Sequence, residues 1–549
     1  MPGHLQVEKS IKMPSSNNVS QTYIIVGGGS TGCVIAARLS EDPNVTVTLL
    51  EEGPRDSSPY IKFPGTYYKT AQGELLKRYP WEPTEGHPRE NQDTMVQASV
   101  LGGGSSVNAM IYIRGNPADY DLWQASGADG WSYNDVLPYF KRSEDNERFC
   151  NDVHGVGGPL GVSDPRYVHP LTKRWLQACQ QAGFNYVDDF NAGNQEGCGL
   201  YQITAKNGKR SSASSAFLKP AQSRKNLQVL TGKKVTRILI EQGRAVGVEY
   251  LENGTRVTLR AEREVIISAG AINSPKLLML SGIGPADHLR QHGITPHVDL
   301  QGVGENLQDH LEMSLVYQLK GPDSYDKYKL LRWKPWAALQ YLVNQSGPIS
   351  SNLIEGGAFS RGTLSDPIPD LQYFFVVGAG IEEGVNAVPG GNGCTINFGQ
   401  VRPRSRGRVS LRSGDPFDVP RIAPNYLSDD YDIACLTEGF FRAQEIMKQP
   451  AIRQYIVCQN FPEREIFDRD EVAAFLRKYT HAALHPAGTC KMGRDALSVV
   501  DPQLRVRGIE GLRVADASVM PNVISGNING PCIMIGEKAS DLIRGIGLA

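Results

Sequence analysis

The chain has 549 residues, and its 57 Lys and Arg residues nearly balance 58 Asp and Glu residues, which gives a formal net charge of −1. This balance argues against nucleic-acid binding as the main function, because a phosphate backbone is held by a surplus of cations. The hydrophobic fraction of 40% and the 58 glycines indicate a folded chain with many tight turns.

The nine cysteines occur without any CxxC pair. This pattern indicates free thiols in a reducing compartment and not a disulfide framework or a structural zinc site. No apolar run is long enough for a spanning helix, and residues 1–20 lack the apolar core of a signal peptide. We therefore expect a cytoplasmic protein without a transmembrane segment, for which the only membrane contact left is a peripheral one.

The first predicted elements are a strand over residues 22–26, a glycine-rich turn, a helix over 33–40 and a strand over 45–50. The turn matches G-x-G-x-x-G, whose glycines allow a tight turn and a close approach of backbone to a pyrophosphate at the helix N-terminus. An acid at the end of the second strand can accept hydrogen bonds from ribose hydroxyls. The predicted dinucleotide-binding residues are Gly27, Gly29, Ser30, Thr31, Gly32 and Glu51.

Residues 28–32 also fit G-x-S-x-G, the nucleophile elbow of α/β-hydrolases. A serine hydrolase acting through Ser30 is therefore an alternative function. It is disfavoured because hydrolase sheets have several strands before the elbow, and because it leaves Glu51 unexplained.

Three later blocks are also distinctive. Residues 101–115 are rich in glycine and serine, which lets backbone approach a flat or anionic group, although a loop between domains would have the same composition. A strand over 264–268 leads into Ala-Gly-Ala-Ile-Asn-Ser-Pro and an apolar helix. The last block, residues 485–531, contains His-Pro-Ala-Gly-Thr-Cys and Ser-Gly-Asn-Ile-Asn-Gly-Pro.

Taken together, these blocks resemble the glucose–methanol–choline (GMC) family of flavin oxidoreductases, from Tyr23 to Arg544. Within that family the chain is similar to the choline dehydrogenase-like branch with bacterial alcohol dehydrogenases, and to hydroxymethylfurfural and aryl-alcohol oxidases. The resemblance implies an FAD cofactor. Some members attach FAD covalently to a His at the position of Val107, and valine cannot form that bond, so we expect non-covalent FAD.

The resemblance also assigns the catalytic pair. His485 matches the catalytic His, and Asn527 matches its partner. Taken alone, His485 would more often be a structural His before a proline turn, and Asn527 an ordinary turn residue. The implied flavin contacts are Gly103, Asn108, Ala109, Met110, Val235, Asp516, Ala517, Ile528 and Asn529.

The implied reaction is the oxidation of an uncharged primary alcohol, aliphatic or aromatic, to an aldehyde. His485 takes the hydroxyl proton while a hydride passes to flavin N5, and a quinone-type acceptor or oxygen reoxidises the flavin. An oxidase that uses oxygen and makes hydrogen peroxide is the main alternative, and a flavin-bound lyase is a more distant one. A strand over 370–377 is expected to line the pocket with Phe374 and Phe375, unless they belong to the sheet core.

No metal site is predicted. His288 with His292, and His481 with His485, have helical ligand spacing, but neither pair has the Glu of H-E-x-x-H.

The expected architecture has two discontinuous domains. The first is an α/β, doubly wound, Rossmann-like FAD-binding domain that comprises residues 20–160, 205–315 and 480–549. The second is an α+β substrate domain that comprises residues 161–204 and 316–479 and is built on an antiparallel sheet.

Overall fold

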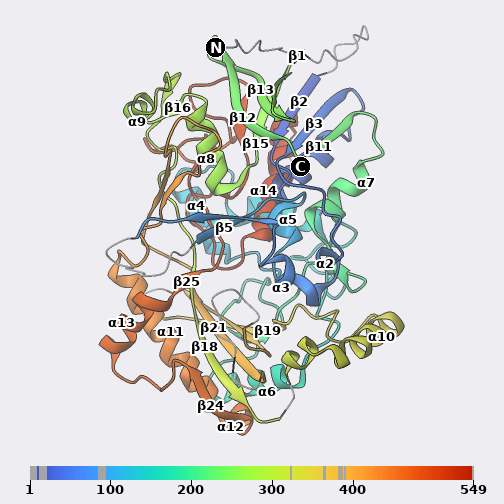
Figure 1. Cartoon of the computed structure of the whole chain (residues 1–549), viewed down its shortest axis with the longest axis vertical. Coiled ribbons are helices and arrows are strands. Elements are labelled where there is room, and N and C mark those ends of the chain that lie inside the picture. The colour runs from blue at the N-terminus through green and yellow to red at the C-terminus, as the bar shows by residue number, and fades with distance from the viewer. Residues whose placement is uncertain are drawn as a thin grey trace, which may run out of the picture.

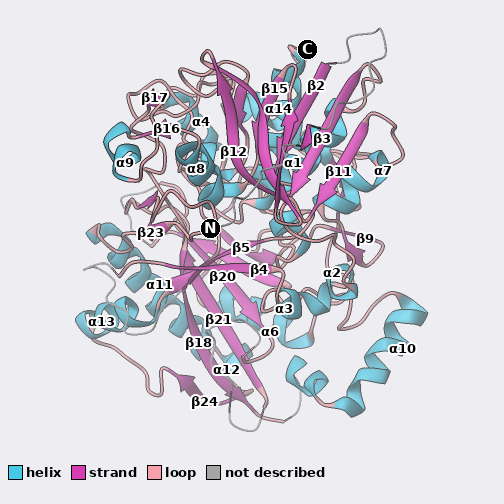
Figure 2. Ribbon diagram, turned by 45° about the horizontal axis from the view of Figure 1, so that its top comes forward, coloured by secondary structure: helices cyan, strands magenta, loops and turns pink. Residues whose placement is uncertain are grey.

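The computed structural model describes residues 9–10, 21–83, 94–321, 324–362, 367–380, 388 and 391–546. Two lobes follow one another along the longest axis, one built on a parallel sheet and the other on an antiparallel sheet (Figure 1). The strands of the two lobes form separate layers (Figure 2).

Five strands of the described chain form the parallel sheet, in the order β11-β3-β2-β15-β26. Their bounds are Leu227–Thr231 (β11), Val45–Glu51 (β3), Gln21–Val26 (β2), Glu264–Ile267 (β15) and Leu512–Val514 (β26). Buried parallel strands need nearly continuous apolar runs, which the Ile-Ile-Val of β2 and the Val-Ile-Ile of β15 supply. The expected α/β, Rossmann-like fold of this lobe is confirmed.

Helix α1 (Ser30–Leu39) follows the glycine turn and packs against α14 (Asn529–Arg544), which also contacts α5 (Tyr133–Ser143). A second, mixed sheet packs on the parallel one through contacts with β3 and β15. Its strands are β1 (Lys9–Ser10), β14 (Thr255–Arg260), β13 (Arg244–Glu252) and β12 (Lys234–Glu241). A doubly wound sheet is covered by helices, so this β layer was not foreseen from the sequence.

Seven strands within the described ranges form the antiparallel sheet of the second lobe, in the order β24-β18-β21-β20-β19-β8, with β25 paired to β18. Their bounds are Ile456–Phe461 (β24), Leu311–Leu319 (β18), Gly393–Gln400 (β21), Leu371–Val376 (β20), Gly356–Ser360 (β19), Gly197–Leu200 (β8) and His481–Ala482 (β25). Because β18 begins at Leu311 and β25 lies beyond residue 479, this sheet extends past both ends of the predicted 316–479 segment.

Helices α6 (Pro170–Gln181) and α11 (Asp430–Lys448) pack on this sheet, and α12 (Pro450–Arg453) and α13 (Arg469–Tyr479) pack on those helices. Each lobe has its own buried apolar cluster, with Trp123 and Trp131 in the first and Trp175 in the second. The two sheets therefore have separate hydrophobic cores.

Short elements connect the layers. They are α2 (Pro59–Lys62), η1 (Pro64–Thr66), α3 (Tyr67–Thr70), β4 (Leu76–Pro80), β5 (Thr94–Ala98), η2 (Gly103–Ser106), α4 (Pro117–Ala125), β6 (Glu144–Asn146), β7 (Leu160–Val162), β9 (Ala205–Lys206), β10 (Lys209–Arg210), η3 (Ser214–Leu218), α7 (Lys219–Ala221), α8 (Gly270–Leu280), β16 (Ile283–Gly284), α9 (Ala286–Gln291), β17 (Val298–Asp299), η4 (Tyr325–Lys329), η5 (Leu331–Trp333), α10 (Lys334–Asn344), β22 (Arg408–Ser410), β23 (Arg421–Ala423) and η6 (Ala517–Val519). Across the part of the chain that is described, no helix is both long and apolar enough to cross a bilayer. All nine cysteines are free thiols, and seven of them are buried.

Candidate active site

One cavity of about 820 Å³ has walls from both lobes. Gly27 and Glu51 line one part of it, and His485 and Asn527 line another. This volume lies within the range of about 300–1,000 Å³ that is typical of ligand and cofactor sites. The predicted dinucleotide turn and the predicted catalytic pair therefore share one space.

The glycine turn after β2 is fixed by packing. Gly27 has a φ of 104°, and a Cβ there would lie 2.3 Å from the carbonyl oxygen of Ser268. A Cβ on Gly32 would lie 2.0 Å from the oxygen of Gly27. Gly29 has only that Ser268 oxygen, at 3.9 Å, near its added Cβ, so this residue presents bare backbone to the cavity. The two outer glycines bring α1 against β2 and β15, and the middle one leaves room for a ligand.

The carboxylate of Glu51 is held at the end of β3. One oxygen accepts a 2.7 Å hydrogen bond from the backbone N–H of Gly28, and the other accepts one of 2.7 Å from Gly53. Burial raises the pKa of this carboxyl group, and the two N–H donors oppose that shift. Glu51 lines the cavity in a fixed orientation, as an acceptor for ribose hydroxyls requires.

The first residues of α1 are bonded to the N-terminus of α14. The hydroxyl of Ser30 donates to Oδ1 of Asn529 at 2.9 Å, and that of Thr31 donates to the carbonyl oxygen of Cys532 at 2.9 Å. A hydrolase nucleophile would instead donate to a general base, so this geometry disfavours the Ser30 alternative. Nδ2 of Asn529 is buried without a partner among the described residues and lines the cavity, so it is available to a cofactor oxygen.

The loop that contains Gly103, Asn108, Ala109 and Met110 lines the cavity. The guanidinium of Arg210 holds it, donating at 2.7 Å both to the backbone oxygen and to Oδ1 of Asn108. Burial lowers the pKa of Arg210 to about 9. Arg210 was not predicted, because a single Arg in a short hairpin has no sequence signal for this role.

The remaining predicted flavin contacts come from three other segments. Val235 lies in β12, Asp516 caps η6, Ala517 begins it, and Ile528 precedes α14; all four line the cavity. The carboxylate of Asp516 accepts from the N–H of Gly270 at 2.8 Å, and so connects α8 to η6. The side chain of Asp516 is thus held by a hydrogen bond within the protein.

These residues fit an FAD. The bare backbone of Gly29, the oriented Glu51 carboxylate and the unpartnered Nδ2 of Asn529 occupy the walls of one cavity. The N-termini of α1 and α14 meet there and present backbone N–H groups that suit a pyrophosphate.

His485 and Asn527 form a close pair on the cavity wall. Nε2 of His485 lies 3.3 Å from Nδ2 of Asn527, and Nδ1 of His485 lies 3.0 Å from Nδ1 of His310. Burial lowers the pKa of His485 to about 4. The pKa of His310 is also lowered, by burial and by His485. Both imidazoles are therefore neutral at pH 7.

A chain of hydrogen bonds fixes which atoms of this pair face each other. The hydroxyl of Tyr201 donates to the backbone oxygen of Tyr373 at 2.8 Å, so it must accept from Nε2 of Gln372 at 3.2 Å. The same Nε2 donates to Oδ1 of Asn527 at 3.1 Å, which turns Nδ2 of Asn527 towards His485. Because a backbone oxygen can only accept, it fixes the direction of every bond in this chain of hydrogen bonds.

This orientation selects a tautomer. Because Nδ2 of Asn527 is a donor, Nε2 of His485 must carry a lone pair, and its proton must be on Nδ1. Nδ1 can then donate to His310. Asp309 anchors the same residue, since its Oδ1 accepts from the backbone N–H of His485 at 2.7 Å, and burial raises the pKa of this carboxyl to about 7. Gln372, His310 and Asp309 were missed in the sequence because they lie more than 150 residues from their partners.

The pocket prediction needs a correction at Phe375. Phe374 lines the cavity, but Phe375 stacks on Trp175 with ring centroids 5.2 Å apart. Neighbouring residues of a strand point to opposite faces, so these two rings could not line one pocket. Glu312, at the start of β18, is a further cavity residue that was not predicted.

Two family models described as GMC oxidoreductase match residues 21–312 and 403–536. The chain is 42% identical over 529 residues to the oxygen-dependent choline dehydrogenase of Brucella ovis, with 95% of each chain covered. It is 39% identical over 526 residues to the alcohol dehydrogenase (acceptor) of Pseudomonas putida, again with 95% of each chain covered.

Solved structures match the fold of the chain as well. The pyridoxine 4-oxidase from Mesorbium loti matches with a TM-score of 0.85 and 29% identity, covering 95% of this chain and 98% of the other. The formate oxidase of Aspergillus oryzae RIB40, studied for its FAD modification, matches with a TM-score of 0.89 and 28% identity over 96% and 99%. The chain therefore belongs to the GMC oxidoreductase family, whose members are FAD flavoproteins that act on CH–OH groups.

Proposed function

We propose that the protein oxidises an uncharged primary alcohol, aliphatic or aromatic, to the aldehyde with non-covalently bound FAD. The observation that supports this most is the His485–Asn527 pair, which shares a cavity with the glycine turn. Bound FAD would supply a ring that accepts hydride from the alcohol carbon.

The two side chains have different tasks. Nε2 of His485 accepts the hydroxyl proton, which its lowered pKa permits at neutral pH because the imidazole is unprotonated. The Nδ2–H of Asn527 donates to the alcohol oxygen and stabilises the negative charge that grows there. Both groups are oriented before substrate arrives, so little reorganisation is needed.

The walls support an uncharged substrate and a cofactor that is not attached to the chain. Phe374 and Ile354 give the cavity apolar surface. Val107 also lines it and has no atom that could bond to a flavin. A quinone-type acceptor or oxygen completes the reaction, and oxygen would make the protein an oxidase that releases hydrogen peroxide.

A cationic alcohol such as choline is a second candidate. The carboxylate of Glu312 and aromatic rings, among them Phe374 and Trp81, line the same cavity, and this combination suits a quaternary ammonium group. A relative at 42% identity is named a choline dehydrogenase. Glu312→Gln separates the two candidates. If choline is the substrate, this change lowers kcat/KM for choline and leaves kcat/KM for benzyl alcohol unchanged.

The test is an anaerobic bleaching experiment. The purified holoenzyme is mixed with a medium-chain aliphatic alcohol, benzyl alcohol or choline, and the flavin absorption band is followed. Loss of the band with one of them identifies the substrate class, and its return with oxygen or a quinone identifies the acceptor. A colourless protein, or a flavin that no alcohol bleaches, rules out this function; a lyase would keep its band throughout.

The base is tested by His485→Ala. We expect turnover to fall by about 10²–10⁴-fold, the usual loss on removing a general base, while the flavin absorbance per protein is unchanged. A variant with native turnover would show that another group takes the proton.

A further inference from the structure

Helix α10 and the turn before it carry large apolar side chains on the surface. They are Leu330, Leu331, Trp336, Leu339, Leu342 and Val343, each between 50% and 81% exposed. The helix projects from the side of the second lobe in two views (Figure 1 and Figure 2). Contiguous apolar surface of this kind marks a binding surface.

The inner side of α10 is already packed against the rest of the protein. Ala337 and Tyr341, one turn apart, are buried, and the hydroxyl of Tyr341 donates to the carbonyl oxygen of Gly208 at 3.0 Å. Trp336, Leu339 and Val343 follow at helical spacing on the outward side. A helix that is apolar all round is normally buried on all sides, so the outer face is suited to a second apolar environment.

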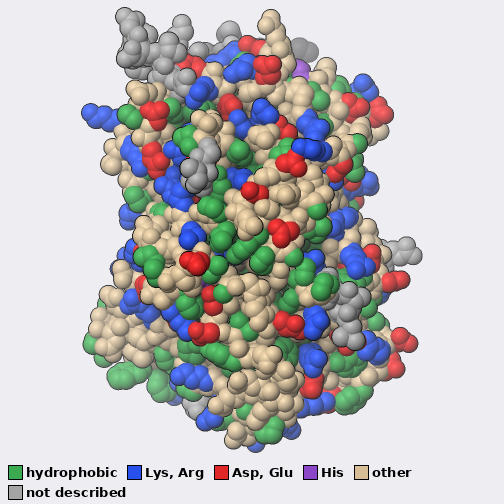
Figure 3. All heavy atoms as spheres, turned by 180° about the vertical axis from the view of Figure 1, so that it is seen from behind, with side chains coloured by type: hydrophobic (Ala, Val, Ile, Leu, Met, Phe, Trp, Pro, Cys, Tyr) green, Lys and Arg blue, Asp and Glu red, His purple; other side chains and the backbone are tan. Residues whose placement is uncertain are grey.

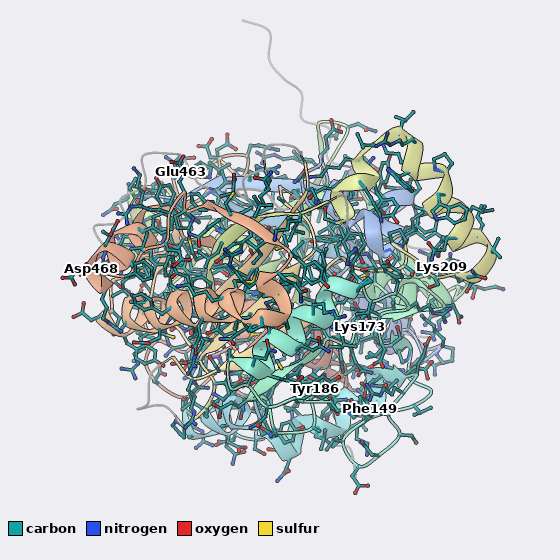
Figure 4. All side chains as sticks on the ribbon, turned by 90° about the horizontal axis from the view of Figure 1, so that it is seen from below. Phe149, Lys173, Tyr186, Lys209, Glu463 and Asp468 are labelled. Atoms are coloured by element: carbon teal, nitrogen blue, oxygen red, sulfur yellow. The ribbon has the colours of Figure 1, made fainter. Side chains whose placement is uncertain are left out.

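The exposed charges on this segment are positive, although one of its cations, Lys329, is paired with the buried carboxylate of Asp326 at 2.6 Å. Lys327, Lys329, Arg332 and Lys334 lie in or just before the helix, and residues 327–344 contain no Asp or Glu. Lys209 adds another cation from the hairpin that α10 contacts, and Figure 4 labels it beside that helix. From behind, hydrophobic side chains gather at the lower edge where α10 lies, with Lys and Arg close by (Figure 3).

We propose that this surface, residues 327–344 with Lys209, docks on an anionic lipid bilayer. Trp and Leu side chains next to Lys and Arg are the composition of helices that lie in the membrane interface. With 11 residues, α10 is too short to cross a bilayer, which takes about 20. A second copy of the chain is a poorer occupant, because a twofold contact would bring the same cations together.

The binding experiment uses the holoenzyme and sedimentation with two kinds of vesicle. One is phosphatidylcholine alone, and the other is an equimolar mixture of phosphatidylcholine and phosphatidylglycerol. We expect binding to the mixture, weakened by salt, and much less to phosphatidylcholine. Equal recovery with both, or none with either, overturns the proposal.

Two variants divide the contributions. Arg332→Gln with Lys334→Gln should weaken binding to the anionic vesicles about thirty-fold, since each cation near the surface contributes about 1 kcal/mol. Leu331→Ser with Trp336→Ser and Leu342→Ser should abolish it. The matched control is Val156→Ser with Phe467→Ser, which removes two exposed apolar side chains elsewhere and should bind as the native protein does.

Brominated phosphatidylcholine in the mixed vesicles reports depth. Trp123, Trp131 and Trp175 are fully buried and Trp81 lines the cavity, so quenching of tryptophan fluorescence would come mainly from Trp333 and Trp336, in α10 and the turn before it. Trp336→Phe should still bind and lose much of this quenching. Unchanged quenching in Trp336→Phe, or full binding by the Leu331/Trp336/Leu342 variant, refutes this orientation. Conversion of a dimer to a monomer by that variant, seen by light scattering, would show that a second copy covers the face.

Discussion

The imidazole of His485 lies where its charged form is disfavoured, because burial removes water from it and lowers its pKa to about 4. A base must be unprotonated to act, so activity should be full at neutral pH and fall only as the pH approaches 4. The free energy of unfolding also falls as the pH falls. Between the ordinary pKa of about 6.5 and the lowered one, the unfolded chain binds the proton more tightly, so acid destabilises the fold.

The pH prediction is therefore a flat profile with a late acid limb. We expect kcat/KM to be constant from pH 7 down to about pH 5 and then to decline. The measurement is a steady-state pH profile with flavin absorbance checked at each pH, so that loss of cofactor is not mistaken for titration. Asp309, whose raised pKa of about 7 lies in this range, is the other group beside His485 that could titrate. An acid limb centred at or above 6.5 that persists in Asp309→Asn contradicts the assignment of His485 as the base.

The orientation of Asn527 depends on one donor that does not line the cavity. Gln372→Met removes the N–H that Oδ1 of Asn527 accepts, so the amide can turn and present oxygen to His485. We expect kcat/KM to fall about tenfold, the equivalent of one lost hydrogen bond, with FAD content unchanged. Because Gln372 acts through Asn527, it should have almost no effect in an Asn527→Ala background.

The control for this cycle is Gln400→Met. Gln400 is also buried in the antiparallel sheet and donates to Asp432 at 2.5 Å, away from the cavity. Gln400→Met should lower the stability of the fold about as much as Gln372→Met does, because each removes buried side-chain hydrogen bonding, and it should leave kcat/KM unchanged. Additive losses in the Gln372/Asn527 double variant would mean that Gln372 only supports the fold.

At the scale of elements, the site depends on how closely α1 can approach β2 and β15. Gly27→Ala would place a methyl group 2.3 Å from a backbone oxygen of Ser268 at a positive φ. We expect a loss of more than about 3 kcal/mol in stability and poor FAD binding, because strain and a clash add. Thermal unfolding and flavin content measure both.

Gly254→Ala separates the two causes. Gly254 has a φ of 79° in the turn between β13 and β14, and nothing lies within 4 Å of its added Cβ. It should cost only about 1–2 kcal/mol, the cost of the left-handed conformation, and leave FAD bound. Similar losses in both variants would show that backbone strain alone determines the effect at Gly27.

The elements that were predictable are the local ones. The strand, turn and helix around Gly27 and the acid at Glu51 lie within one short stretch, so their spacing is enough to predict their geometry. His485 and Asn527 were identified through family blocks and not through any physical pattern. Gln372 could not be recognised, since a buried Gln in an apolar strand gives no hint of the loop it contacts 155 residues away. The error at Phe375 came from neglecting the alternation along that strand.

The cofactor connects the whole molecule, because the cavity is lined by segments from residue 26 to residue 532. If FAD is held without a covalent bond, acid precipitation should leave the flavin in the supernatant. The apoprotein should then unfold at lower temperature, and FAD at about 100 times its Kd should restore about 2.7 kcal/mol. Differential scanning calorimetry before and after FAD addition measures this. Flavin that remains in the acid precipitate contradicts non-covalent binding.

The hydrogen bond from Thr31 to Cys532 joins positions 501 residues apart. At 5–20 residues per second, a ribosome needs about 25–100 seconds to make that intervening chain. During this time the buried face of α1 has no α14 to cover it, although β2 and β3 are already complete. Nascent chains therefore cannot complete the FAD site until their last segment is made. Chaperones have a long interval in which to bind them.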